Sequence, residues 1–112
     1  MLCKINRIKK KKDFEVIFKK GKSFKNSFLL FKTLPNNLKD TRFGFVVSNK
    51  VSKKAVVRNK IRRRMGEVIR LNLNDIKKGI DVVIVVLPGF EKKDFTETKE
   101  VLNKILRELN LI

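Results

Sequence analysis

The segment Val57–Leu71, which reads VRNKIRRRMGEVIRL, decides how this chain can fold. Its apolar side chains recur at intervals of three or four residues, at Val57, Ile61, Met65, Val68 and Leu71. This spacing is typical of one face of an α-helix, and a helix with one apolar face must bury it. The sequence therefore predicts that this helix packs its stripe against a sheet.

The other side of the same helix is predicted to be basic. Four residues should lie opposite the stripe: Asn59, Arg63, Gly66 and Arg70. Arg58 and Arg62 flank the stripe, and Glu67 is one of few acids near enough to pair with these cations. A planar guanidinium binds phosphate oxygens in pairs and stacks on bases, so this side predicts nucleic-acid binding.

The segments beside this helix predict strands. Upstream, Arg42–Ser48 alternates, with Phe43, Phe45 and Val47 on one face, and Ser52 is expected to cap a helix over Lys53–Asn72. Downstream, Ile80–Leu87 is almost wholly apolar and β-branched, which predicts a strand covered on both faces.

The two ends of the chain predict further helices. Asp94 to Glu97 resembles a capping box, and one apolar stripe follows it, at Thr98, Val101, Leu102, Ile105, Leu106 and Leu109. Near the start, Asp13–Lys20 has helical spacing, and Phe24–Leu34 predicts a strand broken near Asn26. Residues 1–12 are expected to be a basic arm, and residues 1–112 one α+β domain with a single sheet.

Composition limits the partners of this domain. Lysine and arginine total 29 against 11 acidic residues, so the formal net charge is +18, which calls for a polyanion. Nucleic acid and an anionic membrane surface both qualify, but the longest apolar run, Val82–Leu87, is far too short to span a bilayer. With Cys3 as the only cysteine and no histidine, neither a disulfide framework nor a zinc site is expected, and we expect an intracellular protein.

The basic helix also carries a family resemblance. The run RNKIRR at 58–63, with Glu67 and Arg70, resembles the signature helix of the ribonuclease P protein family. The segments 46–56, 6–8 and 13–21 resemble the family's loop before that helix and its opening segment. Lys60, Asn49 and Gly66 depart from the family pattern, and Gly66 stands where arginine is more usual.

The resemblance implies an αβββαβα sandwich with a four-stranded sheet and a left-handed β-α-β crossover, the ribosomal protein S5 domain 2-like fold. It also implies that the surface around the signature helix docks on the catalytic RNA. The residues carried over to that surface are Arg58, Asn59, Lys60, Arg62, Arg63, Arg70, Lys50, Lys53 and Lys54.

A separate cleft is implied for the single-stranded 5′ leader of precursor tRNA. Its residues here are Phe14, Phe18, Leu30 and Lys32. Unpaired bases stack on aromatic rings with little regard for base identity, which suits a leader of variable sequence. The alternative interpretation is that Phe14 and Phe18 only anchor the first helix to the sheet.

The resemblance predicts the protein subunit of the ribonuclease P ribonucleoprotein, which assists the endonuclease that removes the leader. Cleavage is expected in the RNA, with Mg²⁺ required by the holoenzyme and no cofactor site in this chain. We expect a cytoplasmic monomer that binds no membrane. A ribosomal protein would share the charge and size but not the combined motifs, and a protein-only nuclease would need clustered carboxylates.

Overall fold

The computed structural model describes residues 2–112. It contains three α-helices, α1 (Lys11–Lys20), α2 (Ala55–Asn72) and α3 (Phe95–Glu108). Four strands form the sheet: β1 (Lys22–Lys25), β2 (Leu29–Pro35), β3 (Arg42–Val46) and β4 (Ile80–Val86). Short 3-10 turns lie at Lys4–Asn6, Leu73–Asp75 and Phe90–Lys92.

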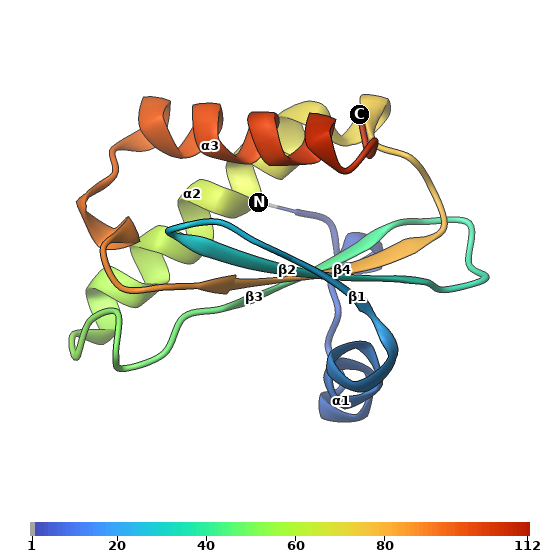
Figure 1. Cartoon of the computed structure of the whole chain (residues 1–112), viewed down its shortest axis with the longest axis horizontal. Helices are drawn as coiled ribbons and strands as arrows, with labels where there is room; N and C mark the ends of the chain where they lie inside the picture. The colour runs from blue at the N-terminus through green and yellow to red at the C-terminus, as the bar shows by residue number, and fades with distance from the viewer. Residues whose placement is uncertain (1) are drawn as a thin grey trace.

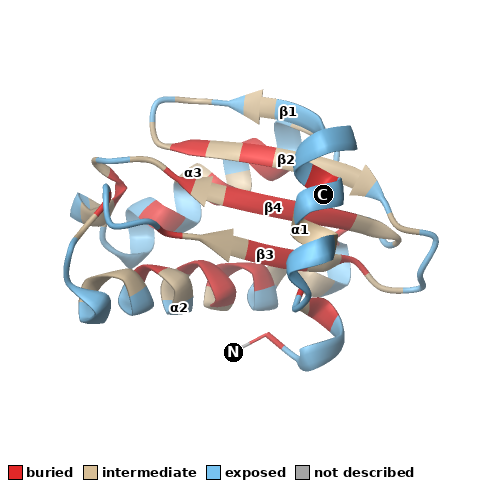
Figure 2. Cartoon of the chain, turned by 90° about the horizontal axis from the view of Figure 1, so that it is seen from below, coloured by how far each residue is buried: buried red, intermediate tan, exposed pale blue. Residues whose placement is uncertain are grey.

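The strands lie in the order β1-β2-β4-β3, with β3 parallel to β4 and the other pairs antiparallel. Helices α2 and α3 cover one face of the sheet, called here the helix-pair face, and α1 crosses the other, called the α1 face (Figure 1). The connection from β3 through α2 to β4 is left-handed (Figure 2), against the usual rule for parallel strands. The expected fold is confirmed, handedness included.

The apolar stripe of α2 packs on the helix-pair face, with one correction. Ile61, Met65 and Val68 are buried as predicted, and Val57 is partly buried against the same core. Leu71, however, is 52% exposed, and Ile69 is fully buried in its place. The reason is α3: the last turns of α2 pack against it as well as the sheet, which turns the buried side toward Ile69.

The helical period also predicts the wrong side of α2 for Gly66. It was expected on the exposed side of α2, but it is buried and its nearest neighbour is the Phe45 ring on β3. Because the buried side of α2 is turned toward Ile69, Gly66 lies on the margin of that side instead of opposite it.

Most predictions that the local sequence makes for the other elements are confirmed. In the predicted long strand, Asn26 Oδ1 accepts hydrogen bonds from the Phe28 and Leu29 amides, which makes the turn between β1 and β2. Asp94 caps α3 in a capping box with Glu97. The Ser52 prediction is wrong: its Oγ accepts from the Lys54 amide in the preceding turn, and α2 begins only at Ala55.

The described part of the basic arm packs at the outer edge of β3, and its last two residues, Lys11 and Lys12, already belong to α1. Leu2, Asn6 and Ile8 are buried, and the Ile8 amide donates to the Phe43 carbonyl at 2.9 Å. Lysines 9–12 remain exposed. The arm therefore joins the first helix to the far edge of the sheet, beside α2 (Figure 2).

Candidate nucleic-acid interface

The first candidate surface, called the α2 surface, consists of the loop after β3 and the outward side of α2. Seven of its predicted residues are exposed, namely Lys50, Lys53, Lys54, Asn59, Lys60, Arg63 and Arg70. The side chains of the four lysines and of Arg63 form no hydrogen bond or ion pair with another described residue, so these cations are available to a polyanion.

Two arginines of the α2 surface are half-buried and held in place. Arg58 donates from Nη1 to the Ser52 carbonyl at 3.0 Å. Arg62 donates to Asn59 Oδ1 at 2.7 Å and to the Val47 carbonyl at 3.3 Å. Because both guanidiniums are fixed against the backbone of the preceding loop, less side-chain freedom would be lost when they contact phosphate.

Arg70 differs from the other arginines of this surface because it already has an acidic partner. Its Nη2 lies 2.5 Å from Glu67 Oε1 in an exposed pair one turn apart. The hydrogen bond from Arg70 lowers the pKa of Glu67 to about 2, and the pKa of Arg70 is raised. Part of the positive charge of Arg70 is therefore offset within the helix.

Two arginines near this surface were missed by the sequence analysis. Arg64 donates to the Lys93 carbonyl at 2.9 Å and so ties α2 to the segment before α3. Arg7, on the arm, forms a bridge with Phe43 and brings its side chain beside Arg62 and Arg63. Only the packing of the arm on β3 reveals this proximity.

The second candidate surface is the part of the α1 face that carries Phe14, Phe18, Leu30 and Lys32; two of these residues come from α1 and two from β2. Leu30 and Lys32 point to the α1 face because Leu29 and Phe31, which alternate with them, are buried in the core beneath α2 and α3. Lys32 pairs with Val83, which in turn pairs with Gly44.

The two phenylalanines of α1 are not equivalent. The Phe14 ring lies directly on Gly44 of β3 and packs with the small cluster of Ile8, Ile17 and Val83. Phe18 is 39% exposed. The anchor interpretation therefore fits Phe14 best, whereas Phe18 offers a ring to solvent; the assignment of either to a leader stays a prediction.

An ion-pair network fixes α1 over this face. Arg42 donates from Nε and Nη2 to the buried Asp81, at 2.8 and 2.6 Å, and Asn36 donates to the same carboxylate. Arg42 also lies 3.5 Å from Asp13 at the start of α1. The hydrogen bond with Asp81 raises the pKa of Arg42. These partners are far apart in sequence, so no local signal could have found them.

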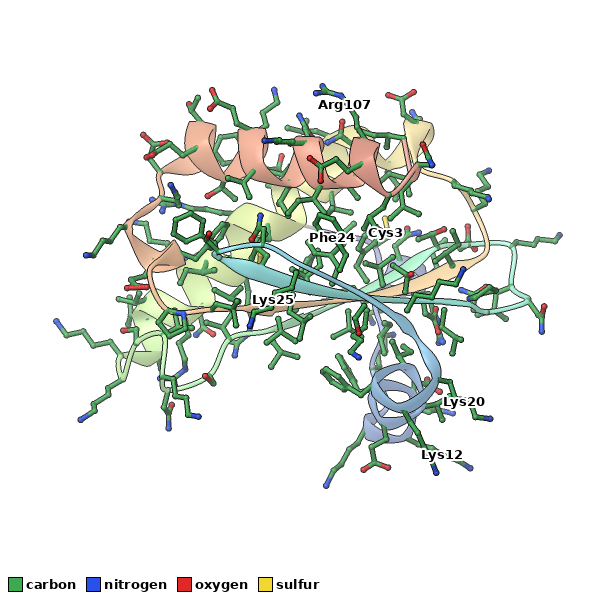
Figure 3. The ribbon with its side chains drawn as sticks, viewed as in Figure 1. Cys3, Lys12, Lys20, Phe24, Lys25 and Arg107 are labelled. Carbon is green, nitrogen blue, oxygen red and sulfur yellow. The ribbon has the colours of Figure 1, made fainter. Side chains whose placement is uncertain are left out.

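More lysines surround the α1 face than the sequence analysis named. Lys25 pairs with Leu30 and so belongs to the same face of the sheet. Figure 3 shows Lys12 and Lys20 projecting from α1 away from the sheet, whereas Phe24 lies between the sheet and α3. The apolar residues of this face are thus bordered by cations.

Residues 2–112 contain neither a cluster of metal-ligating side chains nor a helix that could span a membrane. No three cysteine or acidic side chains there lie close enough together to hold a metal ion. No helix in this range has the length and apolar character needed to cross a membrane.

Comparison with known proteins gives consistent matches. The sequence profile of the family described as Ribonuclease P matches residues 2–110. A ribonuclease P protein component of Alkaliphilus metalliredigens is 36% identical over 107 residues, covering 96% of each chain. One from Rickettsia canadensis is 38% identical over 112 residues, covering 91% of this chain and 95% of that relative.

Solved structures agree in fold. The RNase P protein of Staphylococcus aureus superposes with a TM-score of 0.88 at 29% identity, covering 95% of this chain and 96% of that one. The RNase P protein from Thermotoga maritima superposes with a TM-score of 0.83 at 33% identity, covering 91% and 96%.

Proposed function

This chain belongs to the ribonuclease P protein family, and from that premise we propose that it binds the catalytic RNA of the enzyme through the α2 surface and the 5′ leader of precursor tRNA through the α1 face. In this role it is the protein subunit of a ribonucleoprotein that trims tRNA 5′ ends. The proposal rests on one observation: the chain has two separate surfaces, and they lie on opposite sides of its single small sheet (Figure 1).

The α2 surface suits a structured RNA. Its exposed lysines and Arg63 have no acidic partners among residues 2–112, while Arg58 and Arg62 are held by backbone carbonyls. Mobile cations supply affinity through release of counterions, and fixed guanidiniums supply orientation. Arg70, which is paired with Glu67, should contribute less than Arg63.

The α1 face suits a single strand. Phe18 and Leu30 offer apolar area to unstacked bases, and Lys25 and Lys32 stand beside them to contact phosphates. Such a combination of rings and cations binds single-stranded nucleic acid with little sequence preference. A mature tRNA, which has no leader, would not use this face.

Cleavage itself is proposed to belong to the RNA. The chain has no histidine to act as a base near neutral pH, and its described acids form no cluster for Mg²⁺. We therefore place the Mg²⁺ of the reaction on the RNA and assign no catalytic step to this chain. A monomer within a cytoplasmic holoenzyme remains our expectation.

Reconstitution tests the proposal. The ribonuclease P RNA of the same organism should cleave precursor tRNA with the protein present at Mg²⁺ concentrations where the RNA alone is slow. RNA binding should weaken steeply between 50 and 200 mM salt, by orders of magnitude if several phosphates are contacted. Correct 5′ maturation by the purified protein without RNA would overturn the assignment of chemistry, and salt-independent binding would overturn the electrostatic account.

A further inference from the structure

A small pocket opens between the arm and α2, at the β3 edge of the sheet. Its volume is about 220 Å³, and its lining residues are Leu2, Arg7, Phe45, Arg62, Arg63 and Gly66. Pockets for drug-sized ligands measure roughly 300–1,000 Å³, so this one fits a smaller group, such as a single planar ring system. None of the roles discussed above uses it.

The inner wall of the pocket is apolar and partly aromatic. The half-buried Phe45 ring lies parallel to that of Phe43, at 6.5 Å between centroids, which fixes its orientation. A Cβ built on Gly66 would have Phe45 Cε2, at 3.9 Å, as its nearest neighbour outside the helix backbone. The missing side chain at residue 66 therefore keeps the pocket open, and a longer side chain there would fill it.

The pocket is bordered by three arginines, Arg7, Arg62 and Arg63, so its rim is cationic. Guanidinium groups there can donate hydrogen bonds to the polar edge of a ligand or contact an anion. Arg62 is fixed by its bonds to Asn59 and Val47, whereas the exposed Arg63 is available to an anion.

We propose that this pocket receives one unpaired nucleobase of the RNA bound at the α2 surface. The base would lie against Phe45, place an acceptor beside the Arg7 guanidinium, and leave its flanking phosphates to Arg62 and Arg63. A phosphate alone would not use the apolar wall, and a base inside a duplex could not enter. Bases that are flipped out of RNA loops are commonly held on aromatic rings and arginine planes.

This inference rests on the proposed function, and filling the pocket tests it. Gly66→Leu and Gly66→Met add apolar volume without changing charge, and both side chains favour a helix over glycine. Affinity for the ribonuclease P RNA should fall on the order of tenfold, the effect of losing one stacked base. The slope of the logarithm of the binding constant against the logarithm of the salt concentration should stay the same, because no phosphate contact is removed. Thr96→Leu, at an exposed position on α3 outside the α2 surface, is the matched control, because it also adds apolar volume without changing charge, and it should bind as the wild type does.

Chemical probing of the bases identifies the occupant. One unpaired base that the wild-type protein protects should become reactive with both filling variants, while thermal unfolding shows that they remain folded. The inference is overturned if the variants bind as tightly as the wild type. It is also overturned if affinity falls with a shallower salt slope and no base changes reactivity, since that result indicates a phosphate site. If the wild type itself does not bind this RNA, the proposed function fails instead.

Discussion

The ring of Phe14 rests on the backbone of Gly44: a Cβ added at residue 44 would come within 2.5 Å of Phe14 Cε1. This contact joins α1 to β3, two elements that are separated in the chain by the β1–β2 hairpin. It sets how closely the first helix approaches the α1 face, and therefore how Phe18 is presented.

Gly44→Ala is expected to destabilise the protein by about 1–3 kcal/mol, because the added methyl must displace either the Phe14 ring or the whole helix. The free energy of unfolding from denaturant titration measures this. Gly66→Ala is the control, since its Cβ meets only an ordinary contact at 3.9 Å, and it should gain up to about 1 kcal/mol of helix propensity. Equal effects at the two glycines would mean that the contact with Phe14 is not important.

Phe18→Leu should weaken binding of precursor tRNA to the holoenzyme and hardly change binding of mature tRNA. Leucine keeps an apolar side chain in α1 but removes the stacking surface of an exposed ring, worth roughly 1–3 kcal/mol per base. Titration of both tRNAs with the assembled enzyme makes the comparison. Equal weakening of the two, or merely a lower melting temperature, would show that Phe18 is an anchor and that the leader binds elsewhere.

Arg63→Ala should weaken assembly with the ribonuclease P RNA by on the order of 1.5–3 kcal/mol, the range for a charge-assisted contact. For this variant, the slope of the logarithm of the binding constant against the logarithm of the salt concentration should become shallower by about one, as for the loss of one phosphate contact. Lys99→Ala removes the same charge from an exposed site on α3 and is the control. If the two variants lose affinity equally, net charge rather than the α2 surface governs assembly. With assembly forced by excess protein, Arg63→Ala should regain normal affinity for precursor tRNA.

Glu67→Gln should change how stability depends on acid pH. The pKa of Glu67 is lowered from 4.5 to about 2 by its hydrogen bond with Arg70, so its contribution is present above pH 4.5 and is lost as pH falls toward 2. The wild type should therefore lose more stability than the variant across this window. Melting temperatures of both proteins from pH 7 to pH 2 measure the difference, and parallel curves would contradict it.

The sequence by itself determined the features that depend on near neighbours. The capping box at Asp94, the turn at Asn26, the apolar run of β4 and the helical stripe through Ile61 and Met65 can all be recognised from residues within a few positions of one another. The net charge also follows from the sequence alone, and a value of +18 predicts an anionic partner wherever the cations lie. The family resemblance supplied the crossover's handedness, which no periodicity contains.

Only the tertiary structure decided what depends on packing between distant segments. Placing α3 against α2 buried Ile69 and left Leu71 exposed, although the helical period favoured Leu71. The arm's course along β3 placed Arg7 next to Arg62 and Arg63, and Asp81 met Arg42 across neighbouring parallel strands. Periodicity reports which side of a helix is apolar, but how much of that side is covered depends on every element that packs against it.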